Sequence, residues 1–258
     1  MKHMMVILIL ALLVSSAQAE IFRDNFNDGD LKGWTFVLGA ENGGIQNGEL
    51  VLSSPKPERE AEVIIAVNGI IASDYEVAVS LKISDFFGGD FDGGPSIRLR
   101  AHTPPFVESI IKSNPALENR WLLYEQSYKF FLGINHRMRR RGLGSIIQRV
   151  NVEANLRNGL TVVTLKDSLR AFRLFDFKLH KWYRLKVIAK GDRFQCFIDD
   201  KKMLDFLDDT YTEGRICLSS GLGNHVHFDD FEVQYEALSV QPRRQLTTTW
   251  GKIKSNLH

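Results

Sequence analysis

The stretch KWYRLKVIAKGDRFQCFIDDKKMLDFLDDTYTEGRICLSSG, residues 181–221, decides the fold class. Its apolar positions Tyr183, Leu185, Val187 and Ala189 alternate with Arg184, Lys186, Ile188 and Lys190. A repeat of two is typical of β-strands that turn one face to the core and the other to water. Polar turn residues follow at 190–192 and 199–200. The stretch therefore predicts consecutive antiparallel strands joined by tight turns.

The same alternation recurs along most of the chain. It predicts strands at 49–53, 62–67, 75–83, 96–101, 128–134, 147–152, 160–165, 171–177, 183–190, 193–199, 202–207, 214–219 and 226–235. Helical periodicity is almost absent, so we expect an all-β fold, a two-sheet antiparallel β-sandwich. One irregular, proline-containing insertion at about 103–126 breaks the rhythm and could hold short helices at 106–112 and 116–122.

Composition bounds the classes of function. The chain has 258 residues, 44% of them hydrophobic, and a net charge of +2. A chain of this length can bury a full core without disulfide staples. The balanced charge argues against nucleic acid or an anionic membrane as a partner.

The N-terminal residues have the features of an export signal. Lys2 and His3 precede the apolar run MMVILILALLV, and AQA stands before Glu20. We expect residues 1–19 to be a signal peptide, 20–238 one domain and 239–258 a C-terminal tail. No later run is apolar and long enough to cross a bilayer, so the expected location is secreted or periplasmic, with no transmembrane segment after cleavage.

The two cysteines are expected to stay unpaired. Cys196 shares its strand face with Phe194 and Ile198, whereas Cys217 lies opposite Ile216 and Leu218. If both strands turn their aliphatic faces inward, the two sulfurs point to different sides of a sheet.

The C-terminal third resembles the closing strands of concanavalin A-like, laminin-G-like jelly rolls. The matching residues are Trp182, Gly191, Asp199, Asp200, Asp209, Gly214, Ile216, Leu218, Phe228, Asp229, Asp230 and Val233. RDNFNDGDLKGW, residues 23–34, resembles the opening of the same group, which includes carbohydrate-binding modules. The resemblance implies a jelly-roll sandwich.

For function, the resemblance implies a secreted, non-catalytic carbohydrate-binding or adhesion module whose partner is a polysaccharide or glycan. Two alternatives stay open, because fold alone does not give function. One is a glycoside-cleaving enzyme of the 3-keto-disaccharide hydrolase type, a group related to this fold. The other is an envelope protein-interaction scaffold.

The acidic opening stretch is not an EF-hand. Counted from Asp24, the third position is Phe26 and the twelfth is Thr35, and neither can serve as a side-chain ligand there. The resembling carbohydrate-binding modules hold a structural Ca²⁺ between this loop and the closing aspartate, which here implies Asn27 or Asp28 together with Asp229. The alternative is that these residues only cap turns.

Catalytic patterns are weak. The glycosidase triplet E-x-D-x-x-E is absent, and Asp90 and Asp92 lie in GGDFDGG, where four glycines indicate a loop. No Ser-His-Asp or Cys-His arrangement has supporting context. His225 and His227 would share a strand face, which suits either a metal site or ordinary surface histidines.

Candidate sugar-contacting residues lie in and near the irregular segments. Trp121 and Tyr124 would share a face if the insertion is helical, and they could stack on a sugar or pin the insertion to the sheet. Arg139, in a run of arginines, could contact acidic glycans or simply face solvent. Asp90 and Asp92 could bond hydroxyl groups at the rim of such a site.

Calcium binding predicts a measurable dependence of stability on the ion. If Asn27, Asp28 and Asp229 hold a structural Ca²⁺, excess EDTA should lower the melting temperature and added CaCl₂ should restore it, because an ion that binds only the folded state stabilises it. A melting temperature that does not respond to EDTA would contradict the site.

Overall fold

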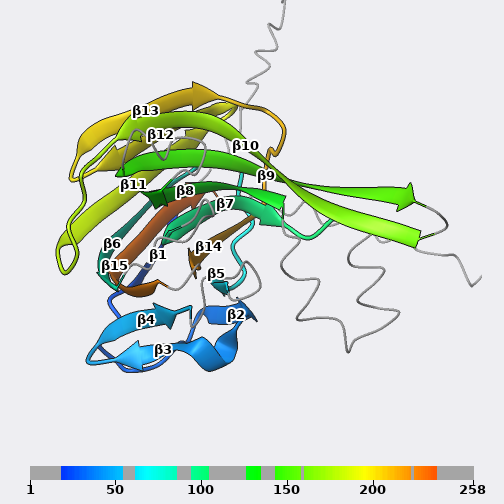
Figure 1. Ribbon diagram of the computed structural model, residues 1–258. Coiled ribbons are helices and arrows are strands. Elements are labelled where there is room, and N and C mark those ends of the chain that lie inside the picture. Colours follow the sequence, from blue (N-terminus) through cyan, green and yellow to red (C-terminus); the bar gives the residue numbers. More distant parts are fainter. Residues whose placement is uncertain are drawn as a thin grey trace, which may run out of the picture.

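The computed structural model describes residues 19–54, 62–85, 94–104, 126–134, 143–157, 160–221 and 224–236. Their strands form two antiparallel sheets packed face to face (Figure 1). A short 3-10 turn, η1 (Ala40–Asn42), follows the second strand. Within the described residues, no helix is long and apolar enough to span a bilayer. The predicted all-β sandwich is confirmed.

The first sheet, here sheet A, has eight strands. In spatial order they are β13 (Lys201–Leu207), β12 (Arg193–Ile198), β11 (Trp182–Lys190), β6 (Tyr75–Asp85), β15 (His225–Glu236), β4 (Glu49–Ser53) and β3 (Gly43–Gln46), and β1 (Ala19–Asp24) also pairs with β15. β4 and β1 share one edge of β15: β4 pairs with its first residues and β1 with its last. The first and last strands of the domain therefore lie side by side.

The second sheet, sheet B, has seven strands. Their order is β10 (Leu160–Leu174), β9 (Leu143–Arg157), β8 (Gln126–Ile134), β7 (Ser96–His102), β14 (Arg215–Ser220), β5 (Val63–Val67) and β2 (Trp34–Leu38). β9 and β10 form a long hairpin whose end reaches beyond the rest of the sheet (Figure 1). At the end of the hairpin Arg157 pairs with Leu160.

The core lies between the sheets. Alternate residues of β11 are buried, among them Leu185 and Val187, and they meet inward residues of sheet B such as Leu99 and Phe130. Burial of this aliphatic and aromatic surface stabilises the sandwich by about 25 cal/mol for each Å² removed from water. The apolar residues that recur with a period of two in the sequence therefore form the inner face of the sheet.

The acidic opening stretch closes the N-terminal end of the core. The Asp24 carboxylate accepts hydrogen bonds from Trp34 Nε1 at 2.8 Å and from the backbone N–H of Phe26 at 2.7 Å. Phe26 and Trp34 are buried and pack with Phe22 and Phe231. Phe26 and Trp34 thus face the core, and Asp24 explains how a polar stretch can enclose them.

Two details of the predicted strands differ. The three short strands expected at 147–152, 160–165 and 171–177 are two long ones, because β10 continues through an irregularity between Leu169 and Ala171. The strands β1, β2 and β3 were not separately predicted. The leader at 1–18, residues 105–125 of the insertion with its two expected helices, and the tail from 239 lie outside the described residues.

No disulfide joins the two cysteines, as parity predicted. Cys196 is buried between the sheets, whereas Cys217 is buried with Ile64 and Ala66 on the outer side of sheet B. A disulfide cannot join them without unfolding, because they lie on different sides of that sheet.

A β-bulge in β7 turns one arginine into the core. Cys217 pairs with Arg98 and Arg215 with Ala101, so β7 has one residue more than β14 over this stretch. The extra residue is Arg100, whose φ of 50° is in the left-handed region. Its side chain is 1% exposed and donates hydrogen bonds to the carbonyl oxygens of Ser73, Tyr211 and Gly191 at 2.6–2.8 Å.

Replacing Arg100 tests this anchor. Arg100→Leu should destabilise the domain by roughly 3 kcal/mol, because it leaves three carbonyl groups without their donor in a buried setting. Urea denaturation measures the change. Arg23→Ala, which removes an ion pair to Glu232 in solvent, is the control and should have little effect. Equal, small effects of both substitutions would contradict the role given to Arg100.

Candidate functional site

The loop between β13 and β14, residues 208–214, is fixed at both ends. The Asp208 carboxylate accepts a hydrogen bond from Tyr128 Oη at 2.8 Å and pairs with Arg149 at 3.1 Å. Burial alone would raise the pKa of Asp208, but hydrogen bonds from Thr210 and Tyr128, with the charge of Arg149, hold it at about 2. At the other end, Gly214 and Ala72 exchange backbone hydrogen bonds at 3.1 and 3.2 Å. The loop is therefore set in place before any ligand arrives.

The middle of the loop is held by Tyr211. Its backbone N–H donates to Tyr128 Oη at 3.1 Å, and its carbonyl oxygen accepts from Arg100 Nη1 at 2.8 Å. Gly214 packs so tightly that an added Cβ would lie 2.4 Å from the carbonyl carbon of Arg100. Only glycine fits there, because the backbone of the β7 bulge packs directly against the backbone of the loop at this position.

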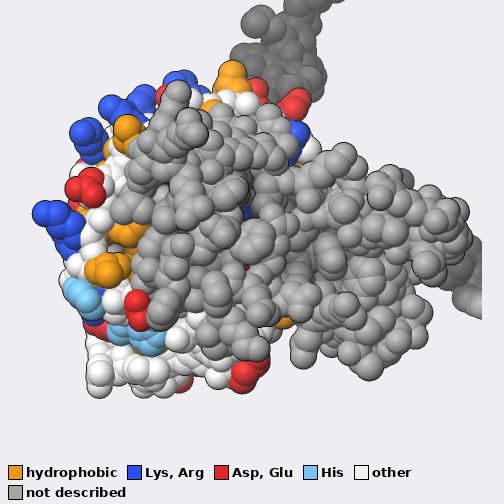
Figure 2. Space-filling view, viewed as in Figure 1, with side chains coloured by type: hydrophobic (Ala, Val, Ile, Leu, Met, Phe, Trp, Pro, Cys, Tyr) orange, Lys and Arg blue, Asp and Glu red, His pale blue; other side chains and the backbone are white. Residues whose placement is uncertain are grey.

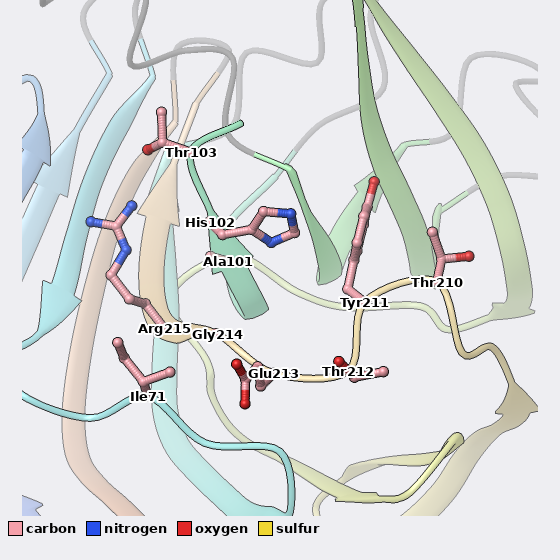
Figure 3. A pocket seen from close by; sticks show the side chains of 10 residues that line it. All are labelled: Ile71, Ala101, His102, Thr103, Thr210, Tyr211, Thr212, Glu213, Gly214 and Arg215. Carbon is pink, nitrogen blue, oxygen red and sulfur yellow. The ribbon is translucent and has the colours of Figure 1, made fainter. Parts of the chain in front are cut away.

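A pocket of about 530 Å³ opens between this loop and the end of β7 (Figure 3). Its lining consists of Ile71, Ala101, His102, Thr103, Thr210, Tyr211, Thr212, Glu213, Gly214 and Arg215. Hydroxyl groups, one guanidinium and one carboxylate surround it, and the exposed Ile71 adds an apolar wall. Pockets of this size with a few fixed polar groups suit small polar ligands.

His102 is positioned by bonds at both ring nitrogens. Nδ1 lies 3.2 Å from the carbonyl oxygen of Arg100, and Nε2 lies 2.9 Å from Gln126 Oε1. Its ring meets the edge of Tyr211 with centres 4.9 Å apart. Because neighbours in the fold take up both nitrogens, the imidazole is suited to shape the pocket and not to exchange protons with a ligand.

A second polar feature lies on the outer face of sheet B. Glu62 Oε1 is 2.6 Å from Arg98 Nη2 and 2.8 Å from Lys129 Nζ, and Ser219 Oγ donates to it at 3.3 Å. Ser96 is bonded to Ser219 at 2.6 Å. Burial alone would raise the pKa of Glu62, but the two cations lower it to about 2. This ionic cluster of Glu62, Arg98, Lys129, Ser96 and Ser219 keeps its carboxylate charged at any ordinary pH.

The expected sugar-contacting residues lie outside the described residues. Asp90 and Asp92 fall in 86–93, Trp121 and Tyr124 in 105–125, and Arg139 in 135–142. Their roles remain predictions.

Two of the expected calcium ligands, Asn27 and Asp229, are placed near the start of β4 by their neighbours in the fold. The side chain of Asn27 lies against Gly48, the residue before β4, and Asp229 follows Phe228, which pairs with Leu50. Burial, with the charges of Asp230 and Glu49, raises the pKa of Asp229. Carboxylate and amide oxygens in a locally negative setting are the ligands Ca²⁺ prefers, so the donor set is chemically suitable. Asp28 also accepts a turn hydrogen bond from the backbone of Asp30, as the capping alternative expected.

Each histidine of the pair, His225 and His227, makes a hydrogen bond through one ring nitrogen. His225 and His227 share the outer face of sheet A with their ring centres 5.1 Å apart. His225 Nδ1 is 2.7 Å from Ser53 Oγ, and His227 Nδ1 is 2.6 Å from Glu49 Oε2. In the described part of the chain, no three His, Cys, Asp or Glu side chains are arranged to hold a metal ion. The surface alternative therefore describes the pair better.

Residues 22–234 match the family of 3-keto-alpha-glucoside-1,2-lyase-like domains. The chain belongs to this family. A search of curated proteins found no match. The family bears out the predicted relation to 3-keto-disaccharide hydrolase-like domains.

Solved structures show the same fold at low sequence identity. The carbohydrate-binding module CBM66 from Bacillus subtilis is 18% identical, with a TM-score of 0.51 over 78% of this chain and 94% of that one. A protein of unknown function with a galectin-like fold, also from Bacillus subtilis, is 17% identical, with a TM-score of 0.53 over 83% and 94%. The kappa-carrageenase of Pseudoalteromonas carrageenovora, solved with an oligotetrasaccharide of kappa-carrageenan, is 11% identical, with a TM-score of 0.51 over 88% and 99%.

Sequence reasoning missed the pocket. Its polar residues come from the loop TYTEGR, 210–215, and from His102 at the end of β7. A hydroxyl-rich loop between two strands was a visible signal. Nothing in the sequence showed that the bulge at Arg100 brings that loop against β7.

The ionic cluster predicts a pH dependence of stability. Because the folded pKa of Glu62 is below its ordinary value of 4.5, its contribution is complete above that pH and is lost as pH falls toward 2. Glu62→Gln should cost on the order of 2–3 kcal/mol at pH 6, and the difference from wild type should shrink between pH 5 and pH 2. Urea denaturation across this range measures it. A difference that stays constant over the range would show that Glu62 is not held ionised by Arg98 and Lys129.

Proposed function

We propose that the domain binds a saccharide in the pocket between β7 and the loop 208–214. A sugar presents hydroxyl groups around flatter apolar faces. The pocket offers the complement: Thr210, Thr212, Glu213 and Arg215 supply donors and acceptors, and Ile71 supplies an apolar wall. The observation that carries the proposal is this polar lining on a loop that is already fixed by Arg100 and Tyr128.

A rigid site favours affinity. The loop pays no ordering cost on binding, because its backbone hydrogen bonds exist without the ligand. The neighbouring structures that bind saccharides support the class of ligand. A structural Ca²⁺ at Asn27, Asp28 and Asp229 would be separate from this pocket and would act on stability.

Binding is favoured over catalysis by the way His102 is held in the wall of the pocket. Both of its ring nitrogens are engaged by the fold. A general acid or base needs a pKa near the working pH and a free position toward the substrate. The family makes cleavage of 3-keto-glucosides the second candidate, in which a base would take the C2 proton beside the keto group, the C1=C2 double bond would form, and the C1–O bond would break so that the leaving group departs with its oxygen.

A glycan array, run with and without calcium, tests the proposal. The protein should bind at least one glycan, and Glu213→Ala and Arg215→Ala should each weaken that binding by about tenfold. Asp209→Ala is the matched control, because Asp209 is exposed on the same loop and does not line the pocket.

Two outcomes would overturn it. One is a silent array; the other is glycan binding that neither pocket substitution changes. Release of product from a 3-keto-glucoside, measured with the same variants, would replace binding with the lyase alternative.

A further inference from the structure

Trp182 lies on the outer surface of sheet A. It begins β11, is 36% exposed and belongs to no part of the core. About one-third of the residue surface is therefore open to solvent. The open part of the indole is a rigid apolar surface that a ligand can contact from solvent.

Trp182 stands in a row that crosses four neighbouring strands. It pairs with Lys82 of β6, Lys82 pairs with His227 of β15, and His227 pairs with Val51 of β4. Because directly paired residues point to the same side of a sheet, all four side chains share its outer face. Glu49, two residues before Val51, lies on the same side.

The polar members of this row hold one another in place. Lys82 Nζ is 3.2 Å from Glu49 Oε2 and 4.5 Å from the centre of the Trp182 ring. The same Glu49 oxygen is 2.6 Å from His227 Nδ1. Their side chains are only about one-fifth exposed, at 18–24%. The indole, cation, carboxylate and imidazole thus form a fixed array, here called the Trp182 face.

The Trp182 face is electrically balanced. Lys82 is matched by Glu49 at 3.2 Å, and Arg184 and Asp229, which both pair with Ser80 in the adjacent row, carry opposite charges. Figure 2 likewise shows basic, acidic, histidine and apolar side chains interspersed on the described surface in that view. A balanced face has no preference for a polyanion.

We propose that the Trp182 face is a second saccharide-binding surface, selective for neutral glycans. The exposed indole would stack on the CH face of one sugar ring, as aromatic rings do with apolar surfaces. Glu49, Lys82 and His227 would bond the hydroxyl groups at its rim. The inference stands apart from the pocket, since it uses other residues on the other sheet.

A saccharide fits this face better than a protein does. Protein interfaces have an apolar centre of several side chains, whereas the described residues here offer one exposed ring among charged groups. Two saccharide sites on one domain would also raise the affinity for a long glycan by effective concentration, without any new contact. The domain could then join two chains of a polysaccharide.

Fluorine NMR of protein labelled with 5-fluorotryptophan tests the proposal directly. The chain has 4 tryptophans, so it gives a small set of resonances, and Trp182→Phe assigns the one of interest. The probes are laminaritetraose, cellotetraose, xylotetraose, mannotetraose and chitotetraose, with a kappa-carrageenan tetrasaccharide as the sulfated comparison. At least one neutral probe should shift the Trp182 resonance. Lys82→Met should weaken that interaction by about tenfold.

The controls separate this site from the pocket. In Arg215→Ala the shift of Trp182 should persist, which shows that it does not depend on the pocket. If no neutral probe moves the Trp182 resonance, or if only the sulfated probe does, the second site is refuted, whatever the pocket binds. If the shift occurs while Arg215→Ala has no effect on any binding, the pocket proposal fails and the Trp182 site stands.

Discussion

The arrangement of the candidate site depends on the buried guanidinium of Arg100. It joins three carbonyl oxygens from segments far apart in the chain: Ser73, Gly191 and Tyr211. The Arg100 Cζ atom lies 4.7 Å from the centre of the Phe194 ring, and this contact packs the guanidinium against the core. Burying a cation costs free energy unless hydrogen bonds satisfy it. If these segments separated, the Arg100 guanidinium would lose its hydrogen-bond partners, so the segments stay together. One side chain therefore ties the end of sheet B to sheet A and sets the loop 208–214.

That constraint also shows what the sequence could and could not predict. Alternation located most strands but missed β1, β2 and β3; where it succeeded, burial of one sheet face imposes a period of two. In SIRLRAH the polar residues Ser96, Arg98, Arg100 and His102 also alternate, and they suggest a single outward stripe. The left-handed φ at Arg100 breaks that stripe and sends its side chain inward. A bulge depends on pairing with a distant strand, so local sequence carries no sign of it.

The position of Trp182 is a second example. Tryptophan is highly buried on average because its side chain is large and mostly apolar. The register of Trp182 opposite Lys82 instead places it on the outer face. By contrast, Trp34 lies in the core, where the Asp24 carboxylate accepts a hydrogen bond from its indole N–H. Trp34 and Trp182 therefore point to different sides of their sheets. Strand pairing sets that side, and residue type does not.

The central claim is that the pocket held by Arg100 receives a saccharide. The most direct measurement is a crystal structure of the protein soaked with the glycan that binds best on the array. The account predicts electron density for a sugar ring between Ile71 and the loop 210–215, with bonds to Glu213 and Arg215, and no movement of the loop. A glycan ordered elsewhere while this pocket stays empty would contradict it.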